Sequence, residues 1–147
     1  DIGCVRMTER HLVADPPTAE QIDATIADVD AGIALADSDV DLAASQTLVG
    51  LAGSVTTVAA LALGLPEYDS EAIHGSRISR ADVDGVTDRL LTMSRVGRSQ
   101  LAVMHPGRVD VIGGGALILS RIMAAGQFDE VLVSEHDILD GIAWSLV

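Results

Sequence analysis

The stretch RVDVIGGGALILSRIM, residues 108–123, is the part of the sequence around which the rest of the chain is predicted to be organised. Val109 to Ile112 is short, β-branched and bounded by glycines, which is typical of a buried strand. From Ala116 onward the apolar residues recur at helical spacing, and Gly126 closes the pattern. The sequence therefore predicts a strand, a turn at Gly113–Gly115 and then a helix.

Three glycines between a strand and a helix are chemically informative. Such a turn lets backbone N–H groups approach an anion closely, and the start of a helix adds positive potential there. The same spacing is equally consistent with a tight turn that binds nothing, because glycine accepts the positive φ of any tight turn. At this stage both interpretations stand.

A second unit of the same kind lies earlier in the chain. Thr47–Val49 is a β-like run, Gly50–Thr57 is rich in glycine and hydroxyl residues, and Val58–Leu63 has helical character. The hydroxyls in this loop belong to Ser54, Thr56 and Thr57. N-capping explains any one of them, because serine and threonine commonly cap helices.

Several common sites are disfavoured by the motifs. Neither glycine loop matches G-x-G-x-x-G, and a P-loop is excluded because the chain contains no lysine. The four histidines lack the spacing of a zinc site. Cys4 lies in an apolar segment and is interpreted as a core residue.

Composition narrows the class of protein. The 147 residues are enough for one domain with a real core, and the sequence starts with Asp1, which suggests a piece of a longer protein. A net charge of -13 disfavours nucleic-acid binding, while nine arginines still suit a local phosphate contact. No apolar run reaches the roughly 20 residues of a membrane helix. A single cysteine fits a reducing, cytoplasmic setting.

The remaining elements follow from periodicity and capping signals. Thr18 and Gln21 form a capping box before a helix whose apolar stripe ends at Ile33, and Ser79 with Asp82 starts another helix. The other predicted elements are strands at Ile2–Thr8, Ala72–Ile78 and Phe128–Ser134, a helix at about Arg98–Met104, and a C-terminal helix with Ile138, Leu139, Ile142 and Leu146 on its inner face.

Four segments together carry a resemblance to a known family. They are, in order, Gly3–Glu9, Val49–Leu61, Arg108–Ile118 and Val133–Gly141. Their order and spacing resemble the second, C-terminal actin-like domain of the exopolyphosphatase/guanosine pentaphosphate phosphatase (Ppx/GppA) family, in its actinobacterial form. The resemblance covers essentially the whole of residues 1–147.

The resemblance implies an α/β fold of the ribonuclease-H-like, actin-like ATPase class: a mixed sheet flanked by helices, here lacking its first strands. It also implies a ligand cleft facing a partner domain. The phosphate- or nucleotide-binding residues carried over by it are Gly50, Ala52, Gly53, Ser54, Gly113, Gly114 and Gly115. The catalytic glutamate, the first phosphate loop and most of the Mg²⁺ ligands of the family are expected outside this chain.

The implied activity is removal of terminal phosphate from polyphosphate, with this chain supplying one wall of the cleft. The alternatives are a guanosine pentaphosphate phosphatase or a non-catalytic domain that binds guanosine polyphosphate or polyphosphate. We expect the isolated chain to be inactive and to dimerise through the exposed edge of a strand at Ile2–Thr8.

Overall fold

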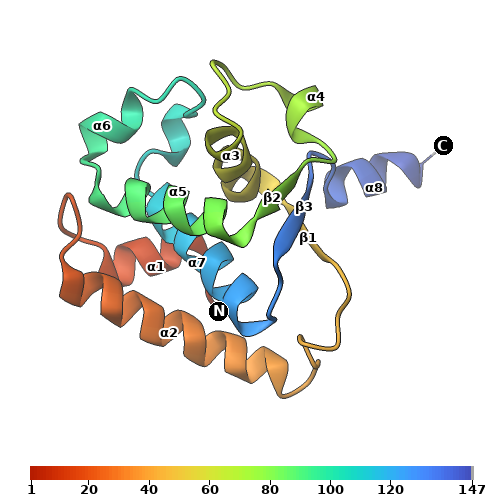
Figure 1. Cartoon of the computed structure of the whole chain (residues 1–147), viewed down its shortest axis with the longest axis horizontal. Coiled ribbons are helices and arrows are strands. Elements are labelled where there is room, and N and C mark those ends of the chain that lie inside the picture. The colour runs from red at the N-terminus through yellow and green to blue at the C-terminus, as the bar shows by residue number, and fades with distance from the viewer. Residues whose placement is uncertain (147) are drawn as a thin grey trace.

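The computed structural model describes residues 1–146, along which eight α-helices, one 3-10 helix and three strands follow one another (Figure 1). The elements are α1 (Cys4–His11), α2 (Ala19–Asp37), β1 (Leu48–Leu51), α3 (Ala52–Ala62), α4 (Ser70–Ile73), β2 (Arg77–Ser79), α5 (Arg80–Thr92), α6 (Arg95–Ser99), η1 (Pro106–Arg108), α7 (Ile112–Ala125), β3 (Glu130–Ser134) and α8 (Ile138–Trp144).

The three strands form a mixed sheet, as the resemblance implies, and their order in it is β1-β3-β2. β1 runs parallel to β3, with Gly50 opposite Val133, and β2 runs antiparallel to β3, with Ile78 opposite Val131. These four residues are buried on the inner face of the sheet. On the outer face, the Val49 residue of β1 is 50% exposed.

Helices α3 and α5 contact the inner face of the sheet, and α7 packs against both of them. On its other side α7 meets α1 and α2, so that it runs through the middle of the molecule (Figure 1). A helix covered on all sides is apolar all round. This position explains why the first turns of α7 carry glycine and alanine and not polar residues.

Several start and stop signals are confirmed. Thr18 and Gln21 form the predicted capping box of α2, and Ser79 accepts a hydrogen bond from the Asp82 N–H at the start of α5. The predicted strands near Thr47 and Phe128 are β1 and β3.

The strand predicted at Val109–Ile112 is wrong. Residues 106–108 form a 3-10 turn, and α7 begins at Ile112, so Gly113–Gly115 belong to its first turn. The buried Arg98 side chain donates to the Val109 carbonyl (Nε···O 2.9 Å), which occupies an acceptor that a strand would offer to a neighbour. Burial between helices, and not pairing in a sheet, explains the apolar run.

The strand predicted at Ile2–Thr8 is also wrong, because residues 4–11 form α1 with Gly3 as its N-cap. Met7 is the fully buried residue of this helix, in contact with α2 and α7. The Ala72–Ile78 prediction is partly wrong, since a helix ends at Ile73 and β2 starts at Arg77. The helix predicted near Arg98 instead spans Arg95–Ser99.

Helix α8 forms where the sequence predicts a C-terminal helix, with Asp137 and Asp140 in a capping box. Its predicted inner face is wrong for the part of the chain that the structure describes. The apolar residues of that face are 51–83% exposed: Ile138, Leu139, Ile142 and Leu146. Figure 1 shows α8 leading away from the sheet towards the C-terminus.

Candidate functional site

The carboxyl ends of β1 and β3 lie at the same edge of the sheet, because these two strands are parallel. In open α/β sheets, ligands bind outside this edge. β1 passes directly into α3 there, with Leu51 as the N-cap and Ala52 at a φ of 66°. No side chain caps the first N–H groups of α3, which leaves them as donors at a positive helix end.

The guanidinium of Arg108 lies over the start of α3. A Cβ atom at Gly53 would overlap the guanidinium carbon and nitrogens, so the arginine can lie against the helix only because residue 53 is glycine. Arg108 donates from Nη1 to Thr57 Oγ1 at 3.0 Å, and the Thr57 hydroxyl donates to the Gly53 carbonyl at 2.7 Å. An arginine beside unpaired helix N–H groups is a favourable anion site.

Arg98 fixes the segment that carries Arg108. Besides the Val109 carbonyl, its guanidinium donates to the Met93 carbonyl at 2.7 Å and to Asp15 Oδ1 at 3.2 Å. It therefore ties the end of α5, the loop after α1 and the approach to α7 together. Replacing it would release the turn from which Arg108 extends.

A pocket of about 560 Å³ opens beside Arg108. Its lining comes from the loop after α3, the segment before α7 and the end of β3: Tyr68, Ala102, Val103, Met104, His105, Pro106, Arg108 and Glu135. The Tyr68 hydroxyl lies 2.7 Å from Thr56 Oγ1 and 2.7 Å from Glu135 Oε1. Burial raises the pKa of Tyr68; the Thr56 hydrogen bond and the nearby Arg108 oppose this rise, and Glu135 adds to it.

The glycines of the two predicted loops lie differently from one another. Gly53 and Ser54 are in the first turn of α3. Gly50 faces the core, where a Cβ would lie 2.9 Å from the Val131 side chain. The three α7 glycines are buried.

Each α7 glycine permits a close contact between helices. A Cβ at Gly113 would lie 3.3 Å from the Leu91 side chain. At Gly114 it would lie 2.8 Å from Thr8 Oγ1, and at Gly115 it would lie 2.7 Å from Ser54 Cβ. The structure thus gives these residues a packing role, and it brings Gly115 against the Ser54 side chain at the start of α3.

Arg108, Tyr68 and Glu135 line the pocket of this candidate site but are not among the residues predicted from the sequence. Arg108 is the first residue of the stretch 108–123, of which only the three glycines are predicted to bind a ligand. Tyr68 and Glu135 are 67 positions apart and carry no local motif, so only the fold brings them together.

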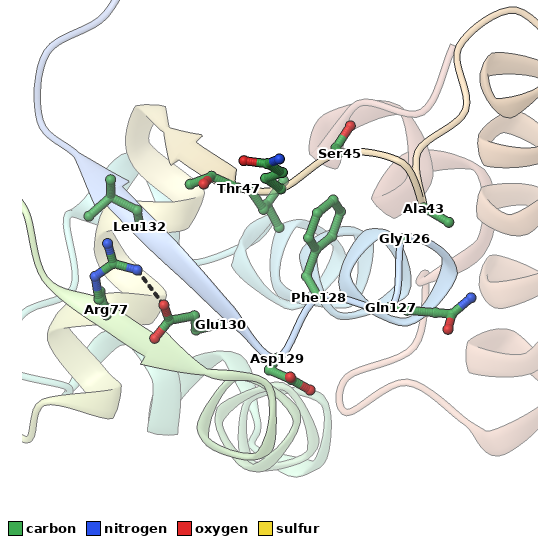
Figure 2. A pocket seen from close by; sticks show the side chains of 12 residues that line it. Ala43, Ser45, Thr47, Arg77, Gly126, Gln127, Phe128, Asp129, Glu130 and Leu132 are labelled. Atoms are coloured by element: carbon green, nitrogen blue, oxygen red, sulfur yellow. Dashed lines mark hydrogen bonds and ion pairs between the residues drawn. The ribbon is translucent and has the colours of Figure 1, made fainter.

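A second pocket, of about 580 Å³, lies at the opposite, amino-terminal ends of β1 and β3. Figure 2 shows its Arg77 side chain directed at Glu130, with which it forms an ion pair, and Asp129 nearby. The one arginine of this pocket is already paired with a carboxylate. This pocket therefore attracts an anion much less strongly than the Arg108 pocket does.

Within residues 1–146, no three His, Cys, Asp or Glu side chains are grouped so as to hold a metal ion. No helix of this part of the chain is long and apolar enough to cross a membrane.

Comparison with known proteins gives consistent matches along the whole chain. The sequence profile of the Ppx/GppA phosphatase family matches residues 1–147. Exopolyphosphatase 2 of Mycobacterium tuberculosis is 49% identical over 150 residues, which cover 99% of this chain and 47% of that protein.

Two solved structures extend the comparison. A crystal structure of an exopolyphosphatase-like protein superposes with a TM-score of 0.94 at 45% identity, covering 99% of this chain and 48% of the other. The Ppx-GppA enzyme of Aquifex aeolicus gives a TM-score of 0.88 at 25% identity, covering 97% and 46%. The chain thus spans about half the length of the relatives it matches.

Proposed function

The chain belongs to the Ppx/GppA phosphatase family, and from this premise we propose that it forms one wall of the phosphate-binding cleft of an exopolyphosphatase. Both the family and the actin-like fold predicted from the sequence are confirmed by the matches. The cleft, its ligand and the reaction are our inference for this chain.

One observation carries the proposal: Arg108 lies across the start of α3, and Gly53 leaves the space for it. Polyphosphate is a chain of anionic tetrahedral groups. Its oxygens suit a guanidinium that can donate two hydrogen bonds and a helix end with free N–H groups. Gly53 and Ser54 are the predicted residues that we retain as direct contacts, with Arg108 added.

The other half of the site belongs to the polypeptide outside these residues. We propose that the base that activates water and the ligands for Mg²⁺ lie there, in an amino-terminal domain that closes the cleft, and that the protein works in the cytoplasm. The described residues bind and orient phosphate and no more. The 147 residues alone should therefore release no phosphate from polyphosphate.

The test is Arg108→Met in the full-length protein. Loss of a charged hydrogen-bond donor to phosphate costs on the order of 2–3 kcal/mol, so kcat/KM for polyphosphate should fall about 30- to 150-fold. Arg77→Met, in the pocket at the opposite end of the sheet, is the matched control and should leave kcat/KM unchanged. Equal effects of the two substitutions would contradict this assignment.

The same assay separates the alternatives. An exopolyphosphatase should release phosphate from polyphosphate faster than from guanosine pentaphosphate. A preference for the guanosine compound would favour a guanosine pentaphosphate phosphatase. Tight binding without phosphate release by the full-length protein would favour a sensor domain.

A further inference from the structure

The Tyr68 side chain connects three elements at the mouth of the Arg108 pocket. It projects from the loop between α3 and α4, and its hydroxyl contacts Thr56 on α3 and Glu135 after β3. A phenol has one O–H hydrogen, and a carboxylate can only accept. Tyr68 therefore donates to Glu135 and accepts from the Thr56 hydroxyl.

This arrangement holds the Glu135 carboxylate at a defined place in the pocket. Arg108 lines the same pocket, and among the described residues its side-chain hydrogen bond goes to Thr57, not to a carboxylate. The Glu135 backbone N–H also donates a hydrogen bond to His74 Nδ1 at 3.2 Å. A negative charge thus lies in the pocket of the site arginine without neutralising it.

We propose that Glu135, positioned by Tyr68, is an internal competitor that weakens the binding of phosphate ligands at Arg108 and thereby determines how strongly the site distinguishes highly charged from weakly charged anions. The inference rests on the proposed phosphate cleft. Like charges repel within a partly enclosed pocket, and the repulsion grows with the charge of the ligand. The binding of phosphate anhydrides that carry several charges is therefore weakened more than the binding of inorganic phosphate.

Tyr68 has the opposite effect to Glu135, because it favours the binding of phosphate at Arg108. By donating its hydroxyl hydrogen to the carboxylate, it keeps Glu135 from turning to Arg108 and forming an ion pair. Without the hydroxyl, the carboxylate is free to pair with the guanidinium and to exclude phosphate from it. Tyr68 and Glu135 should therefore be strongly coupled in a double-mutant cycle.

The experiment measures the affinity of the full-length protein for sodium tripolyphosphate and for inorganic phosphate by calorimetry at one pH and ionic strength. Glu135→Gln removes the charge and keeps an acceptor for Tyr68. It should raise the affinity for tripolyphosphate about three- to tenfold and that for inorganic phosphate by less. Glu71→Gln removes an exposed charge of α4 that does not line the pocket, and it should change neither affinity by as much as twofold.

Tyr68→Phe keeps the ring and removes the hydroxyl. It should lower the affinity for tripolyphosphate in the natural background and have no effect when Glu135 is replaced by glutamine. A Glu135→Gln protein that binds tripolyphosphate no better than the natural one would overturn the inference, as would equal gains for the two ligands. If Glu135→Gln fails in either of these ways while Arg108→Met abolishes tripolyphosphate binding, the proposed phosphate cleft is still supported and only the competitor role of Glu135 is contradicted. Absence of tripolyphosphate binding in every variant would contradict both.

Discussion

Gly53 shows how a missing side chain can make room for a neighbouring arginine. The residue begins α3, where a side chain would collide with the guanidinium of Arg108. Thr57, one helical turn later, holds that guanidinium by a hydrogen bond. The glycine is therefore needed for the position of another residue and not for an unusual backbone conformation of its own.

Gly53→Ala tests this at the residue scale. Loss of the Arg108–Thr57 hydrogen bond costs about 1 kcal/mol, and alanine gains about as much in helix propensity, so the melting temperature should change little. Tripolyphosphate binding should fall at least tenfold, because Arg108 is displaced from the helix end. Calorimetry and thermal unfolding of the full-length protein measure the two effects.

Gly85→Ala is the matched control for that substitution. Gly85 lies inside α5 with no atom within 4 Å of an added Cβ. Gly85→Ala should raise the free energy of unfolding by roughly 0.5–1 kcal/mol and leave the affinity for tripolyphosphate unchanged. Unaltered tripolyphosphate binding by Gly53→Ala would place Arg108 outside the ligand site.

At the scale of elements, the sequence predicted those that depend on local signals. The capping residues of α2 and α5 specify where these helices start, and the alternation of β3 reflects its buried Val131 and Val133. Predictions failed where burial between helices produced a strand-like run. Val109 and Ile112 are buried because their segment enters the centre of the helical layer, which a short window of sequence does not reveal.

The turn predicted at the three glycines of α7 is wrong for a related reason. Glycine is a poor helix former, so the sequence favoured a turn. Close packing against α1, α3 and the Leu91 side chain stabilises the helix instead, since tertiary contacts override weak local preference. Of the residues in the proposed site, Gly53 and Ser54 could be suggested from the sequence because they follow a strand end, whereas Tyr68 and Glu135 carry no local motif and are brought together only by the fold.

Gly114→Ala distinguishes packing from ligand contact at α7. The new methyl group would lie 2.8 Å from Thr8 Oγ1 and 3.2 Å from the Cys4 carbonyl oxygen on α1. Overpacking of this kind typically costs about 1–3 kcal/mol, and better helix propensity offsets part of it. We expect a lower free energy of unfolding with near-normal tripolyphosphate binding by the folded molecules.

Thr8→Ala provides the matching rescue. The Thr8 hydroxyl is buried without a hydrogen-bond partner among the described residues, so its removal alone should be nearly neutral or slightly stabilising. Combined with Gly114→Ala, it should recover most of the lost stability, which denaturant unfolding of the four proteins measures. A Gly114→Ala protein that melts normally but no longer binds tripolyphosphate would instead assign Gly114 to the ligand.

At the scale of the whole molecule, the most exposed apolar feature of the sheet is β1. Within the described residues it pairs with β3 alone, and its Val49 and Leu51 side chains are 50% and 47% exposed on the outer face. It carries neither a charge nor a proline, the usual protections of an edge strand. Because residues 4–11 are helical, the free edge that the sequence located at Ile2–Thr8 is located here instead.

We therefore expect the 147-residue chain, prepared alone, to self-associate through β1. The predicted homodimer contact is thereby moved from Ile2–Thr8 to this strand. Val49→Lys places a charge on the exposed face of the edge strand and should shift the chain towards monomer in sedimentation equilibrium. Val96→Lys is the matched control, because Val96 is 64% exposed on α6, away from the sheet, and should leave the association unchanged. Two results would count against this edge: a natural chain that stays monomeric at high concentration, or an association that Val96→Lys weakens as much as Val49→Lys does.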